Sequence, residues 1–543
     1  MAYPPLELTS AWKNLQKDGN CFNRPEMHLS RIIHKPGRLP SFSLDTRGIF
    51  YDFSRQRMDM NVLGHLRELA VERDVLAQFR NMMGGTKVNH SERRGALHTA
   101  ARSFSKDPVR IDDTDVMPHI RRVRNEIKRF SARILSGAIT GSTGKRFTDV
   151  VAIGIGGSYL GTEFVSEALA AYATTGIKLH YLSNVDIHNF GRIVSEIDPE
   201  STLWVVISKS YTTAETIANE KLAKAFMREK GLDPAAHIVT VTAKGSPGDG
   251  THDHKTAKNL ATFHMFDFIG GRYSVTSAVG GVPLSLFLGY DLFERFLKGA
   301  EEMDLHAASA DVGTNIPLTA ALISIWNTNM LGYPAQAVIP YAAPLCKLAA
   351  HIQQLNMESN GKSVSADGKP ISHTTGYIVF GEPGTNAQHS FFQLLHQGRP
   401  IPVEFIGVLT PQYREYSTLS KGVTNHQEIW ANLLSQPMAL AQGKEDPDPA
   451  RSFSGNRPSS TIVLPDLSPE SVGRLLSFYE SKTVFEAFLW GINPFDQFGV
   501  ELGKQLASGI RKNMADRNKN AGKDFVNTDP IVEHYLEKLF SVS

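Results

Sequence analysis

The spacing of apolar residues along the chain changes near residue 147. Before that point, apolar residues recur every three or four positions, as in the stretches 61–79 and 120–135. This spacing is typical of amphipathic helices, so we expect residues 1–150 to be mainly helical. The stretch 120–135 also carries a run of basic residues, but apolar residues interleave with them at helical spacing, which indicates a solvated helix face rather than an anion-binding patch.

From residue 147 onward, short apolar runs are followed by Gly or Ser and then by helical stretches. Alternating units of this kind predict a parallel sheet with helices on both faces. In such sheets ligands bind at the carboxyl ends of the strands, where these Gly and Ser residues lie. The runs are DVVAIGIGGS (149–158), KLHYLSNVD (178–186), TLWVVISKS (202–210) and HIVTVTA (237–243).

A second α/β region is expected between residues 318 and 410. Beyond it, residues 444–460 are rich in Pro, Ser and charged residues and are predicted to form a surface loop. Thr528-Asp529-Pro530 combines N-cap chemistry with Pro at a first helical position, which predicts a final helix over residues 531–540. The strand-like runs of the second region are AQAVIPYA (335–342), GYIVFGE (376–382) and PVEFIGVL (402–409).

Composition excludes several classes of protein. The chain has 543 residues, 41% of them hydrophobic, which is enough for two or three packed units. Lys and Arg number 57 against 55 Asp and Glu, so no field of one sign attracts nucleic acid or an anionic membrane. The only cysteines, Cys21 and Cys346, cannot build a disulfide framework or a thiolate metal site, which fits a reducing cytoplasm. The N-terminal residues lack the pattern of a secretory signal, and the longest apolar stretches fall short of the roughly 20 residues of a membrane-spanning helix.

The turn Gly154-Ile155-Gly156-Gly157-Ser158 is the first candidate site. It follows a predicted strand and precedes the helical stretch 160–172, a context in which backbone N–H groups bind anions. In the alternative interpretation, the glycines serve only a tight turn. A nicotinamide dinucleotide site is a further alternative, because Asp186 ends the next predicted strand.

A second turn, residues 208–215 (SKSYTTAE), packs hydroxyl groups and one ammonium into a short segment after another predicted strand. This composition suits a phosphate dianion. Thr212 and Glu215 have the spacing of a capping box, which predicts that the hydroxyls lie at the positive end of a helix. The alternative is a capped helix start that binds no ligand.

Two charged residues are candidates for catalysis. Arg272 follows Gly270-Gly271, and its guanidinium is suited to binding phosphate or to stabilising an oxyanion. The alternative is a structural ion pair. Glu358 follows the helical stretch 348–357, for which Asn360-Gly361 is a typical stop. Near the negative end of that helix a carboxylate takes up a proton more readily, as a general base must. The alternative is an ordinary exposed Glu at a helix end.

His389 is predicted to lie in the first turn of a helix capped by Thr385 or Asn386. Beside the positive end of a helix its imidazole stays neutral near pH 7, and a neutral imidazole can both accept and donate a proton. A structural role is the alternative, because the chain has 19 histidines.

Asn493-Pro494 is predicted to begin another helix. On a continuous helix, Gln497 and Lys504 lie seven residues apart and so share one face. The resulting polar, partly cationic face suggests substrate contacts, and the alternative is a helix face that contacts only solvent.

No spacing of His, Cys, Asp and Glu typical of a metal site is found, so no obligatory metal or cofactor is predicted. His252 and His254 flank Asp253 in a loop rich in Gly, Asp and Lys, which a flexible surface turn explains more simply. The chain also lacks a G-x-S-x-G elbow and a Walker lysine, which argues against esterases and nucleotide kinases.

Taken together, six segments resemble the phosphoglucose isomerase family, and they follow the same order along the chain, over about residues 150–506. The resemblance implies an α/β fold with two sugar-isomerase (SIS) type three-layer αβα domains of mainly parallel sheets, plus N-terminal helices and a C-terminal helical tail. The expected divisions are residues 1–120, 121–290, 291–508 and 509–543. The six segments are GIGGS, SKSYTTAET, GGRYSVTSA, MESNGK, GTNAQHS and INPFDQFGVELGK.

The resemblance also implies catalytic roles. Glu358 is expected to move a proton between C1 and C2 of the sugar through a cis-enediol, and Arg272 to stabilise the negative charge of that intermediate. His389, which the neighbouring subunit contributes in this family, assists ring opening together with Lys504. The substrate-binding residues implied by the resemblance are Gly157, Ser158, Ser208, Lys209, Ser210, Thr213, Gln353 and Gln497.

The activity implied is the reversible isomerisation of glucose 6-phosphate and fructose 6-phosphate, in glycolysis and gluconeogenesis, by a cytoplasmic homodimer without a cofactor. Residue chemistry by itself favours a phosphorylated sugar, and the choice of glucose rests on the resemblance. The alternative is a non-catalytic sugar-phosphate sensor, which needs the phosphate-binding turn but not Glu358, His389 and Lys504 together. A dinucleotide-dependent oxidoreductase gives no role to the hydroxyl-rich turn.

Overall fold

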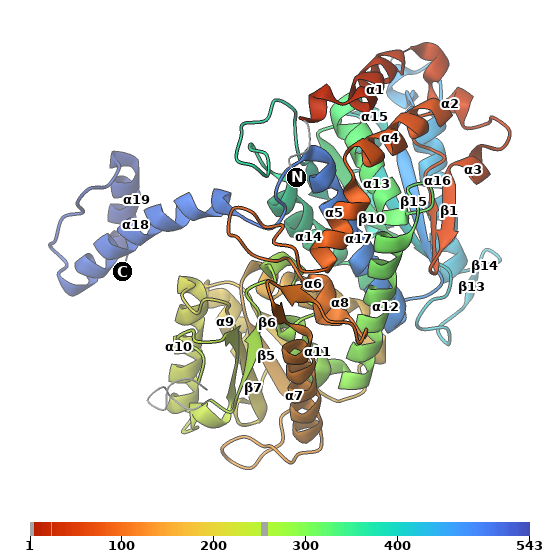
Figure 1. Cartoon of the computed structure of the whole chain (residues 1–543). Coiled ribbons are helices and arrows are strands. Elements are labelled where there is room, and N and C mark those ends of the chain that lie inside the picture. Colours follow the sequence, from red (N-terminus) through yellow and green to blue (C-terminus); the bar gives the residue numbers. More distant parts are fainter. Residues whose placement is uncertain (1–4, 23, 251–258, 543) are drawn as a thin grey trace. The chain divides into compact units, whose positions relative to one another are not determined.

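The computed structural model describes residues 5–22, 24–250 and 259–542 (Figure 1). The chain forms two compact units, a large unit of residues 1–495 and a C-terminal unit of residues 496–543. The large unit contains two principal β-sheets with helices packed against them. Within the described residues, no helix is both long and apolar enough to cross a membrane.

The first sheet has five strands in the order β6-β5-β7-β8-β9, and every neighbouring pair is parallel. The four strands predicted from the sequence are all present. The fifth strand, β9, was not predicted, because only alternate residues of this short edge strand are buried and its apolar run is therefore broken. The strands are β5 Asp149–Ile153, β6 Lys178–Leu182, β7 Thr202–Ile207, β8 Ile238–Ala243 and β9 Ala261–Met265.

Alternate side chains of this sheet enter two separate apolar cores, as the two-residue period of a strand requires. Val151 and Trp204 pack with α9 (Ile187–Val194) and α10 (Ala214–Glu229) on one face. Val150 and Leu203 face the opposite core, to which α11 belongs. The helices on this second side are α7 Met117–Leu135, α8 Leu160–Ala168 and α11 Ala278–Leu288. The predicted three-layer arrangement is confirmed.

The second sheet has six strands in the order β1-β2-β15-β12-β10-β11. Strands β11, β10, β12 and β15 are parallel, whereas the β1–β2 hairpin is antiparallel and pairs antiparallel with β15. The sequence predicted β10, β11 and β12 but missed the hairpin, and the predicted loop 444–460 overlaps the start of β15. The strands are β1 Ser43–Thr46, β2 Ile49–Asp52, β10 Ala335–Pro340, β11 Ile378–Phe380, β12 Val403–Val408 and β15 Ser459–Leu464.

Helices cover both faces of the second sheet. On one face, Val403 and Phe405 pack with α15 (Phe392–Gln397) and α16 (Asn425–Gln442). On the other face, Glu404 accepts a hydrogen bond of 2.6 Å from the hydroxyl of Tyr479, a residue of α17. The helices on this face are α12 Tyr290–Ser309, α13 Ile316–Ile325 and α17 Pro469–Trp490. The side chains of α17 are buried along nearly its whole length.

The remaining short elements of the large unit lie mostly in its N-terminal part. They are α1 Ser10–Cys21, α2 Leu29–Ile32, α3 Arg38–Ser41, α4 Met60–Glu72, α5 Val75–Met83, α6 His98–Arg102, β3 Arg110–Ile111, β4 Thr114–Asp115, α14 Leu348–Ile352, β13 Leu419–Ser420 and β14 Val423–Thr424.

The C-terminal unit contains α18 (Glu501–Lys519) and α19 (Pro530–Ser541). The final helix is confirmed, since Pro530 is its first residue and the side chain of Asp529 accepts a hydrogen bond of 2.8 Å from the N–H of Ile531. Within the large unit, the predicted helix start at Asn493-Pro494 is wrong.

The Asn493 side chain donates to Asn89 (2.9 Å) and Ser91 (2.8 Å), and its Oδ1 accepts a hydrogen bond from the N–H of Phe495 (3.1 Å), but no helix begins at Pro494. Because α18 begins only at Glu501, Gln497 precedes that helix and does not share a helical face with Lys504.

Candidate active site

Glu358 lies in the last turn of a helix, as the sequence predicted. The helix begins as α14 and continues through a π-helical turn, Gln353–Glu358, that the sequence did not indicate. The N–H of Gly361 donates to the carbonyl of Met357 (3.0 Å) and closes this helix end. π-Helical turns are frequent at functional sites because they displace side chains from the regular helical positions.

Arg272 lies directly beside Glu358. Its Nη1 is 3.3 Å from Oε1 of Glu358, and the two side chains are 1% and 21% exposed. The Arg272 Nε also donates to the hydroxyl of Ser359 (2.6 Å), and its Nη2 donates to the carbonyl of Pro494. The cation is therefore held in place from several sides, while part of the Glu358 carboxylate stays accessible to a ligand.

Gln354 completes the surroundings of the carboxylate, although the sequence analysis did not single it out. Its Nε2 donates to Oε2 of Glu358 over 2.9 Å. The same Nε2 lies 3.1 Å from the position that a Cβ on Gly156 would occupy, so the glycine turn and this helix are in close contact. The four-residue spacing between Gln354 and Glu358 is a signal from which this bond was predictable.

Gly157 brings the first candidate turn against the segment of Arg272. A Cβ at residue 157 would lie 2.2 Å from the carbonyl carbon of Gly271 and 2.6 Å from the backbone nitrogen of Arg272, so only glycine fits. The hydroxyl of Ser274 donates to the carbonyl of Gly157 (3.2 Å) across the same contact. With Ser158, the turn follows β5 at its carboxyl end, as expected, and α8 begins at Leu160.

The hydroxyl-rich turn follows β7 and leads into α10. Its predicted capping box is wrong, because the N-cap residue is Thr213 rather than Thr212, and the Thr213 side chain makes no capping hydrogen bond. The Ser208 hydroxyl accepts a bond from the N–H of Tyr211 (3.1 Å), and the hydroxyls of Ser210 and Thr212 are 2.6 Å apart. The hydroxyl of Thr213 is thus not used to cap the helix.

Lys209 links this turn to the segment that precedes Arg272. Its Nζ donates to the carbonyls of Asp267 (2.7 Å) and Ile269 (3.0 Å). Burial, together with the nearby charge of Arg94, lowers the pKa of Lys209 to about 8. An ammonium has three donors, and the two carbonyls accept from two of them.

A buried carboxylate on α17 holds the helix end that carries Glu358. Oε2 of Glu486 accepts hydrogen bonds from the side-chain amides of Asn356 (2.6 Å) and Asn360 (2.8 Å), and its Oε1 accepts one from the Tyr377 hydroxyl (2.8 Å). Burial raises the pKa of Glu486. Because these bonds act on residues on both sides of Glu358, they fix the orientation of the π-helical turn.

Three predicted positions have different surroundings. His389 ends a short 3-10 helix, Asn386–His389, whose N-cap residue is Thr385 as predicted, but this helix is a single turn and α15 begins separately at Phe392. Its side chain is exposed and makes no hydrogen bond or ion pair with any described residue. Gln353 donates to the carbonyl of Val379 (2.9 Å) at the end of β11. Asp186, the alternative dinucleotide-binding residue, accepts a bond from the N–H of His188 (3.0 Å) and caps α9.

The large unit thus joins Gly157, Lys209, Arg272 and Glu358 through direct contacts between their segments. Gln497 and Lys504 belong to the C-terminal unit, in which Lys504 is an exposed residue of α18. In the described part of the chain, no group of three or more His, Cys, Asp or Glu side chains is arranged to hold a metal ion, and His252 and His254 lie outside that part.

This fold and site define an α/β protein whose groups suit proton transfer on a small anion: a carboxylate lies beside a fixed cation, and a turn bearing an ammonium and hydroxyls is bonded to the segment before that cation. Comparison with known proteins makes the assignment specific. Residues 52–530 match the family model described as phosphoglucose isomerase. The chain therefore belongs to the phosphoglucose isomerase family, as its six motifs predicted.

Individual relatives agree with this assignment. The chain is 63% identical over 528 residues to a glucose-6-phosphate isomerase from Desulfosudis oleivorans, with 97% of each chain covered. It is 40% identical over 559 residues to the cytosolic glucose-6-phosphate isomerase of Arabidopsis thaliana, again with 97% of each covered. A crystal structure of a glucose-6-phosphate isomerase from Chlamydia trachomatis matches with a TM-score of 0.90 at 38% identity, over 99% of this chain and 100% of that one.

Proposed function

We propose that this protein interconverts glucose 6-phosphate and fructose 6-phosphate, as an aldose–ketose isomerase of glycolysis and gluconeogenesis. Membership of the family and 63% identity to a glucose-6-phosphate isomerase support the reaction. The observation that carries the proposal is the pair formed by Glu358 and Arg272, 3.3 Å apart, with the cation almost fully buried and the carboxylate partly accessible.

The phosphate group of the substrate is bound by Ser208, Lys209, Ser210 and Thr213. The free hydroxyl of Thr213 and the remaining donor of Lys209 support this role. The phosphate does not react, but its binding holds the carbon chain in register with the base, so that binding energy is used for positioning. Further contacts to the sugar come from Gly157, Ser158, Gln353 and Gln497.

Proton transfer occurs on the open-chain sugar. The carboxylate of Glu358 removes the proton from C2 of the aldose and returns it to C1, while the hydroxyl proton on O2 moves to O1 and C2 becomes the carbonyl carbon. A positioned base contributes about 10²–10⁴-fold to such a step. Arg272 stabilises the negative charge that develops on the cis-enediol, and its surrounding bonds hold it ready before the substrate arrives.

His389 and Lys504 assist opening of the sugar ring, and His389 comes from the neighbouring subunit of a homodimer. The exposed position of the His389 side chain is consistent with this role. We also propose a cytoplasmic location, which the plant relatives named cytosolic and the use of only two cysteines support. The division into residues 1–120, 121–290, 291–508 and 509–543 stays a prediction.

One experiment separates an isomerase from a sugar-phosphate sensor. Wild-type protein is incubated with fructose 6-phosphate in deuterated water, and both glucose 6-phosphate formation and deuterium incorporation are followed by NMR. The wild type should form glucose 6-phosphate labelled at C2. The variant Glu358→Gln should bind fructose 6-phosphate with similar affinity and show neither product nor label. Binding without turnover by the wild type supports the sensor, and substantial turnover by the variant removes Glu358 from the role of base.

A further inference from the structure

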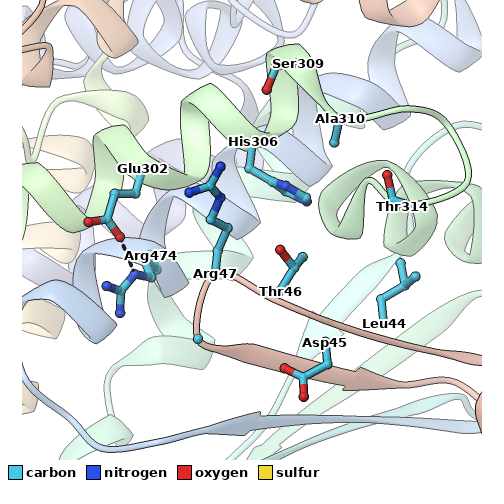
Figure 2. A pocket seen from close by; sticks show the side chains of 11 residues that line it. Leu44, Asp45, Thr46, Arg47, Glu302, His306, Ser309, Ala310, Thr314 and Arg474 are labelled. Atoms are coloured by element: carbon cyan, nitrogen blue, oxygen red, sulfur yellow. Dashed lines mark hydrogen bonds and ion pairs between the residues drawn. The ribbon is translucent and has the colours of Figure 1, made fainter.

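A cavity of about 770 Å³ lies between the β1–β2 hairpin and the C-terminal part of α12 (Figure 2). Residues 44–48 of the hairpin form one side, residues of α12 and the segment that follows it form the other, and Arg474 of α17 contributes as well. None of these residues belongs to the six motif segments. The volume is within the usual range for sites that bind small molecules, about 300–1,000 Å³.

Arg47 occupies the turn of the hairpin and extends toward α12. It has a φ of 55° and is followed by Gly48 with a φ of 69°, so the two residues form the tight turn between β1 and β2. The guanidinium points into the cavity, close to the side chain of His306 (Figure 2). Thr46 and Asp45 both line the cavity, and Figure 2 shows their side chains extending in opposite directions from the strand.

The other titratable groups that line the cavity are Asp45, Glu302, His306 and Arg474. The Nε of Arg474 is 2.7 Å from Oε2 of Glu302, so these two charges offset each other. His306 is buried, and its Nε2 accepts a hydrogen bond from the N–H of Ile316 (3.1 Å). Burial and the charge of Arg47 lower the pKa of His306 to about 4, so its ring is neutral at pH 7.

The side chain of Arg47 is exposed and makes no hydrogen bond or ion pair with any described residue, so its guanidinium is open to a ligand. We propose that this cavity binds a small anion bearing a phosphate or carboxylate group, with Arg47 as the partner of that group. The hydroxyls of Thr46, Ser309 and Thr314 line the same cavity and supply hydrogen bonds to polar groups of the ligand. A guanidinium pairs well with either anion because both accept two parallel N–H bonds.

The conformation of Arg47 does not carry this proposal by itself, because a second hairpin has the same kind of turn. Lys421 and Gly422, with φ values of 52° and 85°, connect β13 to β14. Lys421 is not among the residues that line the cavity. The distinguishing feature of Arg47 is therefore its cavity, and Lys421 provides a matched control.

The test compares the full-length wild type with Arg47→Asn and the control Lys421→Asn. Asn is well suited to the first position of this turn, so both substitutions remove a cation and keep the hairpin. Calorimetric titrations with inorganic phosphate and, separately, with citrate measure the number of sites per chain, and crystals soaked in the anion that binds locate them.

Wild type and Lys421→Asn should bind one anion at Arg47 in addition to any at the catalytic turn, and Arg47→Asn should weaken that site about tenfold or more. Isomerase activity should be unchanged in all three proteins. Binding of phosphate but not citrate, or the reverse, supports the proposal and identifies the anionic group. The proposal is overturned if neither anion occupies the cavity of the wild type, or if Arg47→Asn binds the anion there as tightly as the wild type.

Discussion

Replacing Gly157 by Ala tests whether the contact between the glycine turn and the Arg272 segment positions the guanidinium of Arg272, the cation that we propose acts in catalysis. The added Cβ would lie 2.2 Å from the carbonyl carbon of Gly271, 2.4 Å from its oxygen and 2.6 Å from the nitrogen of Arg272. All three are backbone atoms and cannot rotate away. Ordinary contact begins near 3.4 Å, so the two segments must separate by about 1 Å.

This separation should affect both stability and catalysis. Overpacking of a tightly packed contact costs about 1–3 kcal/mol, and a displacement of about 1 Å at a catalytic group can lower the rate about 100-fold. We therefore expect Gly157→Ala to lower kcat/KM for fructose 6-phosphate by about two orders of magnitude. The loss should be measured well below the melting temperature, which circular dichroism establishes.

Gly191→Ala is the matched control, because Gly191 lies in α9 and a Cβ there would meet no atom within 4 Å. This substitution should stabilise the protein by about 0.5–1 kcal/mol, as Ala does in a helix, and leave activity unchanged. The reasoning is refuted if Gly157→Ala keeps wild-type kcat/KM, or if the control loses activity to the same degree.

Two further predictions concern residues around the site. Ser359→Ala removes the acceptor of Arg272 Nε and the partner of the Tyr273 hydroxyl (2.9 Å). It should lower the free energy of unfolding by about 1–3 kcal/mol. It should also lower kcat more than it changes KM. The control Ser285→Ala, at a buried hydroxyl without a partner in the described structure, should change neither stability nor kcat. If Ser359→Ala and Ser285→Ala lower kcat equally, Ser359 does not position Arg272. Since the pKa of Lys209 is about 8, its ammonium is charged below that pH and loses its proton above it. KM should therefore rise above pH 8 in the wild type and stay flatter in Lys209→Arg, and identical pH profiles would remove Lys209 from phosphate binding.

The features that the sequence predicted well are local ones. Strands β5, β7 and β8 are short runs of mostly buried residues, and each strand from β5 to β8 is followed by a turn that contains Gly or Ser, which is sufficient to recognise it. The start of α19 at Pro530 and the end of the helix at Asn360-Gly361 were also recognisable from neighbouring residues, although the side chain of Asn360 bonds to the distant Glu486 as well. These predictions held because the distant contacts of these segments agree with the local preference.

The elements that were missed depend on distant partners. Strand β2 is stabilised in the sheet by pairing with β15, more than 400 residues later, and no spacing rule connects two such distant segments. The contact between Arg272 and Glu358 joins residues that no spacing rule connects, and only the family resemblance placed them in one site. Glu486 lies on α17, whose buried length hides the helical period that usually identifies a contact face.

The pairing of β2 with β15 also constrains how the chain folds during its synthesis. The β1–β2 hairpin leaves the ribosome early, but its partner strand, Ser459–Leu464, is made only after most of the chain. At about 5–20 residues per second, the outer edge of β2 stays without its partner for on the order of tens of seconds. Unpaired strand edges are sites of aggregation. The short length of this hairpin and the tight turn at Arg47-Gly48 therefore limit a hazard that the order of the strands creates.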